Sequence, residues 1–455
     1  MRLNTSKRKA IALIAVAFVL VFLYGVIRLV IMGTSLQSTY SRLAEVQVAA
    51  KSGDLGAVNG ALDAAVNASA AAASAADDPI VQTWNWVPFL GADTKALGVV
   101  SRDGHSILQA AQQVFSYVNH LKSGSGTNSN GALKPELVSA LRDSTVSLND
   151  ALQLANADFA SIDAGALHFG LDSKFATAKT LIAKTSAAME AATPMVKIGA
   201  AMLSQTGTTH WFIATQNLAE ARALGGIIGA YAVVTVKDGK VHLTQAGSDQ
   251  YLNSLKVLRQ GKYPSELQQL WGIDLNVWQD INASAHAPRT GAMIYDAWKR
   301  ATGTSLDGVI FVGQGTVAHL VAAGGAFSVR GNSLNGSNIA DFLAKGIYAK
   351  YTDVGTKNAV VTEVMAKLFS NLTKKALDTT AFFNSLANEK TGDRLVAWAS
   401  DADLQQTLVD EHVAGVVSSH MGPVVQVTVN NAGGNKLEAY AHVYANYTQG
   451  ECGQL

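Results

Sequence analysis

Cysteine is almost absent from this 455-residue chain, in which Cys452 is the only one. A single cysteine excludes an intrachain disulfide framework and any metal site built from several cysteines. For Cys452 itself we favour an incidental residue, and three other roles stay open: a reactive thiol, a disulfide to another chain, or a disulfide to a cysteine beyond this sequence. The fold must therefore be stable without internal disulfide bonds.

A surplus of charge of either sign is also lacking. The chain has 35 lysines and arginines against 34 aspartates and glutamates, so we expect no nucleic-acid partner. Charged residues make up only 15% of the chain and hydrophobic residues 48%, which is the composition of a folded protein. The length exceeds that of one ordinary core, so we expect two domains in addition to any membrane anchor.

What the chain does have is one long apolar run near its N-terminus. The stretch from Ala10 to Ile27 carries no charge, Arg28 interrupts it, and apolar residues continue to Met32. A helix of about 20 such residues crosses a bilayer core. We therefore predict one transmembrane helix at about Ala10 to Met32. A cleaved signal peptide is disfavoured because the run is too long and no small-residue cleavage site follows Met32.

The charges beside this run predict its orientation in the plasma membrane. Four basic residues precede it: Arg2, Lys7, Arg8 and Lys9. Positive charge favours the cytoplasmic side, so the N-terminus is expected in the cytoplasm and the chain after Gly33 outside it. Near the distal end, Arg28 is expected to extend its side chain to the lipid headgroups. Chemistry that depends on ATP or cytosolic cofactors is not expected in that compartment.

Helical periodicity dominates the next part of the chain, from Thr34 to about Leu203. Four breaks divide it: Lys51–Asp54, Asp77–Pro79, Ser123–Gly131 and Asp163–Gly170. Pro135 occupies a position suited to a helix start, and Pro194 should end or kink the last helix. The pattern predicts a helical bundle or stalk next to the membrane.

Three aromatic residues interrupt this helical pattern in the short stretch Trp84–Gly91. We favour a hydrophobic plug beneath the bundle, because large aromatic side chains are usually buried. The alternative is an aromatic platform that faces carbohydrate or lipid.

The pattern changes to strands near Thr208. Short β-branched and aromatic runs appear at His210–Ala214 and Ala230–Val236, and Lys237–Lys240 is a turn signal that leads into Val241–Thr244. Gly308–Val312 is a candidate buried strand between helical stretches at 292–301 and 316–322. The runs 424–429 and 437–444 suggest a terminal hairpin.

These patterns predict an α/β protein with an N-terminal transmembrane helix, a membrane-proximal helical bundle, and an α/β domain with a central mixed sheet. The expected domains are 1–33, a cytoplasmic tail and transmembrane anchor, and 34–204, the helical bundle or stalk. The α/β domain follows at 205–447, with a tail at 448–455.

A family resemblance rests on Thr215–Tyr231 followed by Val236–Lys240. There a strand that ends in Gln-Asn is followed by Glu-x-Arg, Gly-Gly and a further Gly before a second strand. This resembles the signature of an exported bacterial family catalogued as domain of unknown function 4012. Shorter matches occur at Pro88–Gly91, Asp307–Val309 before Gly324-Gly325, Trp398–Asp401 and Lys436–Tyr440. The resemblance implies an architecture and a compartment, since that family has no established reaction.

More distantly, the order of anchor, helical region and α/β domain resembles the LytR-CpsA-Psr envelope phosphotransferases. Those enzymes attach glycopolymers linked to polyprenyl pyrophosphate to the cell wall. This sequence lacks their Gly-x-Asp-x-Arg and Pro-Arg-Asp-Thr motifs, so no catalytic residue is carried over. The resemblance implies a lipid-linked or wall glycan as ligand, with Mg²⁺ as cofactor only if the chain handles pyrophosphate.

The first candidate site follows the first predicted strand of the α/β domain. Asn217, Glu220 and Arg222 come just after it, and Gly225 and Gly226 permit close backbone approach. The carboxyl ends of strands are where α/β sheets bind ligands. In one hypothesis Arg222 grips a phosphate or carboxylate and Asn217 orients it. In the other, Glu220 and Arg222 form a buried ion pair and the glycines form a tight turn.

The second candidate stretch, Asp274–Arg289, is rich in polar groups and could form the opposite wall of the same cleft or a plain surface loop. Asn276 and Arg289 are its candidate ligand-binding residues, and Asp280, or Asp249 upstream, is the candidate base or metal ligand. The spacing matches no metal pattern, phosphate loop, dinucleotide fingerprint, serine-hydrolase elbow or zinc-protease helix. We therefore expect no metal site and no resident cofactor.

Two functions from different classes stay open. The first is a cell-envelope protein that binds a lipid-linked or wall glycopolymer, and in one version transfers it, with Arg222 and Arg289 as phosphate ligands. The second is a non-enzymatic envelope scaffold or sensor whose helical part holds protein contacts. Composition does not separate them, and whether the chain is an enzyme is left open.

Overall fold

The computed structural model describes residues 5–52, 55–122, 134–205, 207–237, 239–260, 277–374, 377–378, 381–382, 385–386, 395–417, 425–441 and 443–448. The chain divides into two compact units, Met1–Thr193 and Pro194–Leu455. Each is described by itself. The domain boundaries expected at residues 34 and 205 stay predictions.

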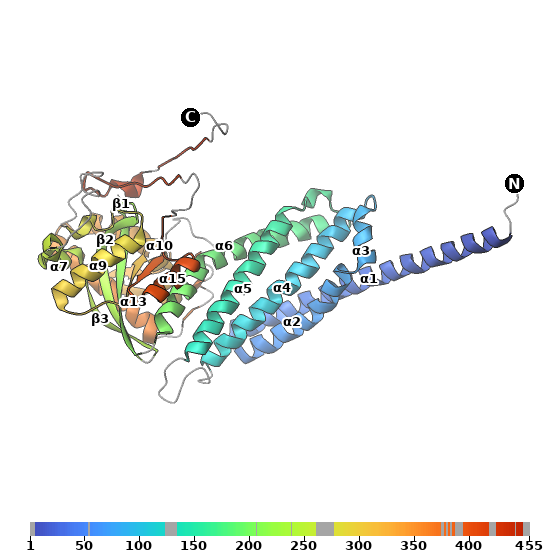
Figure 1. Cartoon of the computed structure of the whole chain (residues 1–455), viewed down its shortest axis with the longest axis horizontal. Helices are drawn as coiled ribbons and strands as arrows, with labels where there is room; N and C mark the ends of the chain where they lie inside the picture. The colour runs from blue at the N-terminus through green and yellow to red at the C-terminus, as the bar shows by residue number, and fades with distance from the viewer. Residues whose placement is uncertain are drawn as a thin grey trace. The chain divides into compact units, whose positions relative to one another are not determined.

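The N-terminal unit is helical (Figure 1). Its elements are α1 (Thr5–Ser52), α2 (Leu55–Ala76), α3 (Pro79–Thr83), η1 (Trp84–Trp86), α4 (Gly91–Lys122), α5 (Pro135–Ala160), η2 (Ala164–Ala166) and the first part of α6 (Leu171–Leu203). The helices end where the sequence predicted breaks, and Pro135 is the first residue of α5. Pro194, in contrast, lies inside α6, so the helix does not end there. The neighbouring residues keep their helical hydrogen bonds, and a proline removes only one such donor.

The longest helix, α1, extends past the rest of the N-terminal unit (Figure 1). The most apolar 18-residue window within its segment Val19–Ala49 has a mean hydropathy of 2.1 and is only 11% buried. In the described part of the chain, α1 is the one helix long and apolar enough to cross a membrane. A signal sequence near the N-terminus has the same length and hydropathy.

The helices of this unit pack through small apolar clusters rather than one large core. Val58 and Leu62 of α2 pack with Leu108 of α4, as the helical period predicted. Phe159 of α5 stacks on Phe175 of α6, with ring centroids 5.0 Å apart. The unit is therefore a helical bundle.

The C-terminal unit contains a five-stranded sheet in the order β3-β2-β1-β4-β7. The strands are β1 (Thr208–Arg222), β2 (Gly225–Lys237), β3 (Lys240–Ser248), β4 (Gly308–Val312) and β7 (Val396–Ala399). β1 and β4 are parallel and the other neighbours are antiparallel, which confirms the predicted mixed sheet. A separate small hairpin pairs β5 (Phe327–Val329) with β6 (Asn332–Leu334).

Alternating residues of the sheet build two cores, one on each face. Trp211 and Ile310 point to one face, where they pack with α10 (Gln314–Gly324) and α13 (Val354–Lys374). Phe212 and Phe311 point to the other, where they pack with α7 (Asp249–Ser254) and α9 (Ala287–Thr302). The sheet is thus the middle layer of an α/β sandwich, which confirms the predicted fold class.

Short helical elements connect these layers. They are η3 (Val257–Gln260), η4 (Trp278–Asp280), α11 (Ile339–Asp341), the π-helical turn η5 (Phe342–Gly346), α12 (Ile347–Lys350), α15 (Ala402–Asp410) and η6 (Leu437–Tyr440).

The expected terminal hairpin at 424–429 and 437–444 is wrong for the residues that the structure describes; residues 424 and 442 lie outside them. Residues 425–431 form no strand, and Leu437–Tyr440 form the 3-10 turn η6. Val425 and Val427 are 58% and 61% exposed, so their alternation buries no face. The segment is tied to β1 instead, since the amide of Asn431 donates to the carbonyl of Ala221 at 2.9 Å.

Candidate functional site

The carboxyl end of β1 carries a bulge. Asn217 pairs with Ile227 and Ala221 pairs with Gly226, so residues 218–220 have no partner on β2. The side-chain oxygen of Asn217 accepts the amide of Ala219 at 2.9 Å, which holds the bulge in place. Asn217, Glu220 and Arg222 therefore belong to the strand and not to a loop after it, and the bulge decides where Glu220 points.

The two glycines of the candidate site serve the hairpin itself. Gly225 has a φ of 146°, which side chains rarely adopt. A Cβ on Gly226 would lie 2.1 Å from the carbonyl of Asn217. The bulged backbone therefore occupies the space beside Gly226. In one of the two hypotheses a ligand would have approached the backbone there.

This contact predicts a sharp contrast between two glycine substitutions. Gly226→Ala should destabilise the C-terminal unit by about 3 kcal/mol or more, because the backbone of Asn217 must move. Gly229→Ala should be neutral or stabilising by up to about 1 kcal/mol, because a Cβ there meets nothing within 4 Å. Urea unfolding, followed by amide exchange of β1 and β2, measures both. Equal effects would refute this account of the bulge.

Arg222 is the centre of a buried polar cluster, and its side chain is only 4% exposed. Its Nε donates to the Gln279 carbonyl at 2.8 Å. Its Nη1 donates to the carbonyls of Ala221 at 2.9 Å and Asn431 at 3.3 Å. Its Nη2 donates to the carboxylates of Glu220 and Asp280, both at 2.9 Å.

These five hydrogen bonds use every donor that a guanidinium has. The arrangement matches the buried ion pair that was the alternative to a phosphate grip, extended by Asp280. The second carboxylate oxygen of Glu220 pairs with Lys436. Arg222 thus ties together the end of β1, the segment 279–280 and the segment 431–436.

Asp249, the other candidate base, joins the same cluster through Gln279. The side-chain amide of Gln279 donates to Asp249 at 2.7 Å and accepts from Asn253 at 2.7 Å. Burial raises the pKa of Asp249 above its ordinary value, and the hydrogen bond from Gln279 acts in the opposite direction. Asp249 is consequently the carboxyl of the cluster whose protonation is shifted toward neutral pH.

Asn217 marks the other side of the cluster, where the parallel strands β1 and β4 end. It accepts a hydrogen bond from Gln314 of α10 at 2.9 Å and donates to the Tyr348 hydroxyl at 3.2 Å. Burial, together with the negative charges of Asp249 and Glu220, raises the pKa of Tyr348 to about 12. Asn217 therefore holds α10 and α12 at this edge.

Around Tyr348 the cluster reaches solvent in a group of tyrosines and lysines. Tyr348 is 37% exposed and Tyr440 is 69% exposed. The ammonium groups of Lys357 and Lys436 lie 5.4 Å and 5.9 Å from the Tyr348 ring centroid. That of Lys345 lies 5.0 Å from the Tyr440 ring centroid. These five residues are called the tyrosine-lysine surface below.

The sequence interpretation missed this surface. Lys345 and Tyr348 are three residues apart on consecutive helical turns, a spacing that places them on one face. Lys436 and Tyr440 were quoted only as a short family match. The signal was therefore present, but nothing in the sequence brings these segments together.

The remaining candidates lie elsewhere. Arg289 is exposed in the first turn of α9, whereas the Arg222 side chain is only 4% exposed. The charge of Arg289 acts on His286, whose pKa is lowered first by burial and then by Arg289. Asn276 lies outside the described residues. Of the two arginines expected to share a phosphate, Arg222 has its donors taken by the chain and Arg289 faces solvent.

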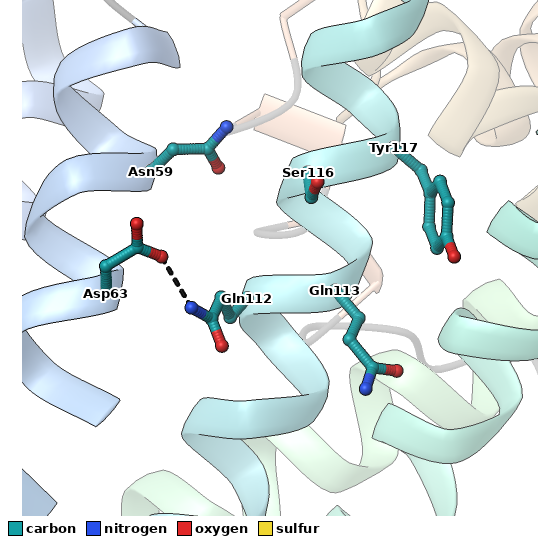
Figure 2. Close-up of a pocket in the computed structure, with 6 residues that line it drawn as sticks. All are labelled: Asn59, Asp63, Gln112, Gln113, Ser116 and Tyr117. Atoms are coloured by element: carbon teal, nitrogen blue, oxygen red, sulfur yellow. Dashed lines mark hydrogen bonds between the residues drawn. The ribbon is translucent and has the colours of Figure 1, made fainter. Parts of the chain in front are cut away.

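A polar cavity of about 300 Å³ lies between α2 and α4 in the N-terminal unit (Figure 2). It is lined by Asn59, Asp63, Gln112, Gln113, Ser116 and Tyr117. Gln112 donates to Asp63 across the cavity, and the buried side-chain oxygen of Asn59 has no hydrogen-bond partner. These groups suit a small hydroxylated molecule, although the sequence analysis singled out none of them.

No group of three or more histidine, cysteine, aspartate or glutamate side chains that could hold a metal ion occurs among the described residues. The carboxylates of Glu220 and Asp280 accept hydrogen bonds from Arg222, and that of Asp249 accepts one from Gln279. The described carboxylates of the cluster are therefore engaged by hydrogen bonds within the chain and do not fit a Mg²⁺ site.

Fold and site together define a class: a protein with one apolar N-terminal helix, a helical unit, and an α/β unit whose bulged first strand is locked by a buried arginine. Residues 206–348 match the family model described as Protein of unknown function (DUF4012). The match runs from the start of β1 to Tyr348 and confirms the first family resemblance. No curated protein and no solved structure matches the chain. The likeness to LytR-CpsA-Psr enzymes stays a hypothesis.

Proposed function

We propose that α1 anchors this protein in the plasma membrane by a single span, with the N-terminus in the cytoplasm and the chain after Gly33 outside. The apolar length of α1 supports the span. The basic residues Arg2, Lys7, Arg8 and Lys9 support the orientation.

The α/β unit, in this proposal, binds an anionic glycopolymer of the cell envelope, either lipid-linked or attached to the wall. The observation that carries this is the tyrosine-lysine surface at the edge where β1 and β4 end. Exposed tyrosine rings offer flat faces to sugar rings, and lysine ammonium groups attract phosphate. Among the described residues Lys357 forms no salt bridge, although its charge acts on the Asp353 carboxylate one helical turn before it, so its ammonium group can still reach a ligand.

The proposal moves the phosphate-binding role away from Arg222, whose donors the chain itself occupies. For transfer in addition to binding, Asp249 is the candidate base, because a carboxyl with a raised pKa accepts a proton better near neutral pH. Asp280 is held by Arg222 at 2.9 Å and is the poorer candidate.

Binding of polyprenyl pyrophosphate by the full chain in lipid nanodiscs tests this function. Lys357→Ala and Tyr440→Ala are each expected to weaken binding about tenfold, the effect of losing about 1.4 kcal/mol of contact energy. Lys299→Ala is the matched control, because Lys299 also lies over a tyrosine, 5.6 Å from the ring centroid of Tyr295, but on α9.

Three controls sharpen the result. Polyprenol without pyrophosphate distinguishes recognition of phosphate from recognition of lipid. Soluble wall glycan tests whether the glycan alone is bound. Addition of Mg²⁺ tests whether binding depends on that ion. Failure of the wild-type chain to bind either the pyrophosphate or the glycan would remove the proposal. So would equal weakening by Lys299→Ala.

A non-enzymatic scaffold or sensor is the second candidate, and one observation favours it. Arg222, the most buried charged group of the candidate site, has all five of its donors occupied by groups of its own chain. A photoreactive residue in place of Tyr440 would then form a discrete adduct with one envelope protein in intact cells. Adduct formation with glycan alone would argue for the first candidate.

A further inference from the structure

The two most exposed aromatic side chains described in the N-terminal unit lie close together in the sequence. They are Trp86, 88% exposed, and Phe89, 83% exposed, in the segment that links α3 to α4. Phe89 has a φ of 68°, in the left-handed region that a phenylalanine rarely adopts. The hydrophobic plug favoured from the sequence is therefore wrong for these two residues. Outward-facing aromatics of this size mark an interaction surface.

The same segment packs against the apolar run of α1. The ring of Trp84 lies 5.2 Å from the ring of Phe22. A Cβ on Gly25 would lie 2.7 Å from the Trp84 Nε1, so the glycine allows the indole to approach α1 closely. The exposed pair Trp86 and Phe89 is consequently at the level of α1 residues that belong to the predicted span.

A polar network next to this contact neutralises the one charge in the apolar run. Arg28 lies 3.2 Å from the Asp78 carboxylate and donates to the Ser74 carbonyl at 2.6 Å. Tyr24 donates to the same carboxylate at 2.7 Å. Because the chain balances this charge itself, Arg28 does not need the lipid headgroups that the sequence analysis assigned to it. Arg28 can then lie close to lipid with its charge balanced.

The depth follows from helix geometry. Phe22 precedes Arg28 by six residues, which is about 9 Å along a helix. With Arg28 at the outer boundary of the span, Trp84 and its neighbours lie about 5–10 Å into the headgroup and acyl boundary, the depth that amphipathic interfacial segments reach. Tryptophan is enriched at that depth because its ring is apolar and its N–H is polar.

The turn between α5 and α6 lies at the same end of this unit as α3 and the start of α4 (Figure 1). Phe169, 82% exposed, lies in the turn between α5 and α6. The neighbouring amide of His168 donates to Asp93 in the first turn of α4 at 2.7 Å, which ties the turn to that end.

We propose that the segment Trp84–Phe89 is a second membrane contact, which inserts Trp86 and Phe89 into the outer leaflet beside α1. The inference rests on the proposed anchoring by α1 and goes beyond it. An anchor alone leaves the bundle free to tilt about the span, whereas a second contact to one side of α1 fixes its tilt and rotation. The lipid surface is the occupant because the segment is continuous with the exposed apolar face of α1, which includes Val21 and Leu23.

Fluorescent labels on single cysteines in the full chain test the contact. In a Cys452→Ser background, Trp86→Cys and Phe89→Cys are labelled with an environment-sensitive dye and reconstituted in phosphatidylcholine vesicles that contain spin-labelled lipids. Val21→Cys reports on the anchor, and Val48→Cys is the control. Val48 is also on α1 and 70% exposed, but about 30 Å farther along the helix than Arg28.

We expect blue-shifted emission and quenching at positions 86 and 89, comparable to those at position 21. We expect neither effect at position 48. Because the native side chains are exposed, these substitutions leave the packing of the bundle intact. Quenching at position 21 but not at 86 and 89 would overturn the second contact and leave the anchor standing. Absence of quenching at position 21 would overturn the anchor itself. A blue shift without lipid quenching would indicate a second copy of the chain, and also overturns the contact.

Discussion

Replacing Arg222 with alanine is expected to destabilise the C-terminal unit by about 3–5 kcal/mol, because it leaves the carboxylates of Glu220 and Asp280 without their buried cation. It also removes hydrogen bonds to the carbonyls of Gln279 and Asn431, which hold two other segments to β1. Urea unfolding of the full chain, read from amide exchange in β1 and β2, measures the loss.

Arg289→Ala is the matched control for this prediction. Arg289 is exposed, so its removal should change the unfolding free energy by no more than about 0.5 kcal/mol. If both arginines instead bind phosphate, the two variants would fold normally and share a loss of ligand affinity. That outcome would contradict the role assigned here to Arg222.

Asp103→Asn is expected to stabilise the N-terminal unit at neutral pH. Asp103 is 7% exposed on α4, and one of its carboxylate oxygens is buried without a hydrogen-bond partner. Burial, reinforced by the negative charge of Asp158, raises the pKa of Asp103 from 3.8 to about 6. Ionising this carboxyl therefore costs the folded state free energy that the unfolded chain does not lose.

The sign of the pH dependence follows from the same shift. Between pH 3.8 and about 6 the folded state binds more protons at Asp103 than the unfolded state, so stability falls as the pH rises. The whole loss is about 3 kcal/mol, from about 1.4 kcal/mol for each unit of pKa. Asparagine carries no charge, so the variant should gain up to that amount at pH 7 and lose this part of the pH dependence.

Thermal unfolding of the detergent-solubilised chain at pH 4.5 and pH 7.5, followed by amide exchange in α4 and α5, tests this expectation. Asp150→Asn is the control, because Asp150 is exposed on α5. An unchanged pH profile in Asp103→Asn, or the same change in the control, would contradict this account. Ionisation of Asp103 would then not lower the stability of the folded state.

Local patterns predicted much of the fold. The strand β4 was predicted with its exact bounds, Gly308–Val312, because five apolar residues in a row fit a strand buried on both faces. The turn at Lys237–Lys240 closes the β2–β3 hairpin as expected. The helix breaks were equally readable, since proline, glycine and aspartate act on the backbone beside them. All of these signals act within a few residues.

The candidate site was less predictable. Asn217, Glu220 and Arg222 were singled out, and they do lie together with Asp249 and Asp280. Their roles depend on Gln279 and Asn431, which are distant in the sequence. The backbone carbonyls of these two residues accept hydrogen bonds from Arg222, and a sequence motif does not identify backbone acceptors. The terminal hairpin failed for the same reason, because alternation at Val425 and Val427 indicates a strand only where a sheet edge is available.

The sequence by itself determined the apolar N-terminal helix, the helical part after it and the strand-rich part near Thr208, since hydrophobic periodicity is a local property of the chain. The tertiary structure alone decided which polar and aromatic side chains face inward. It buried Arg222 among acceptors from three segments, and it left Trp86 and Phe89 exposed beside α1. Burial is set by residues far away in the sequence, and no local pattern of arginine or tryptophan records them.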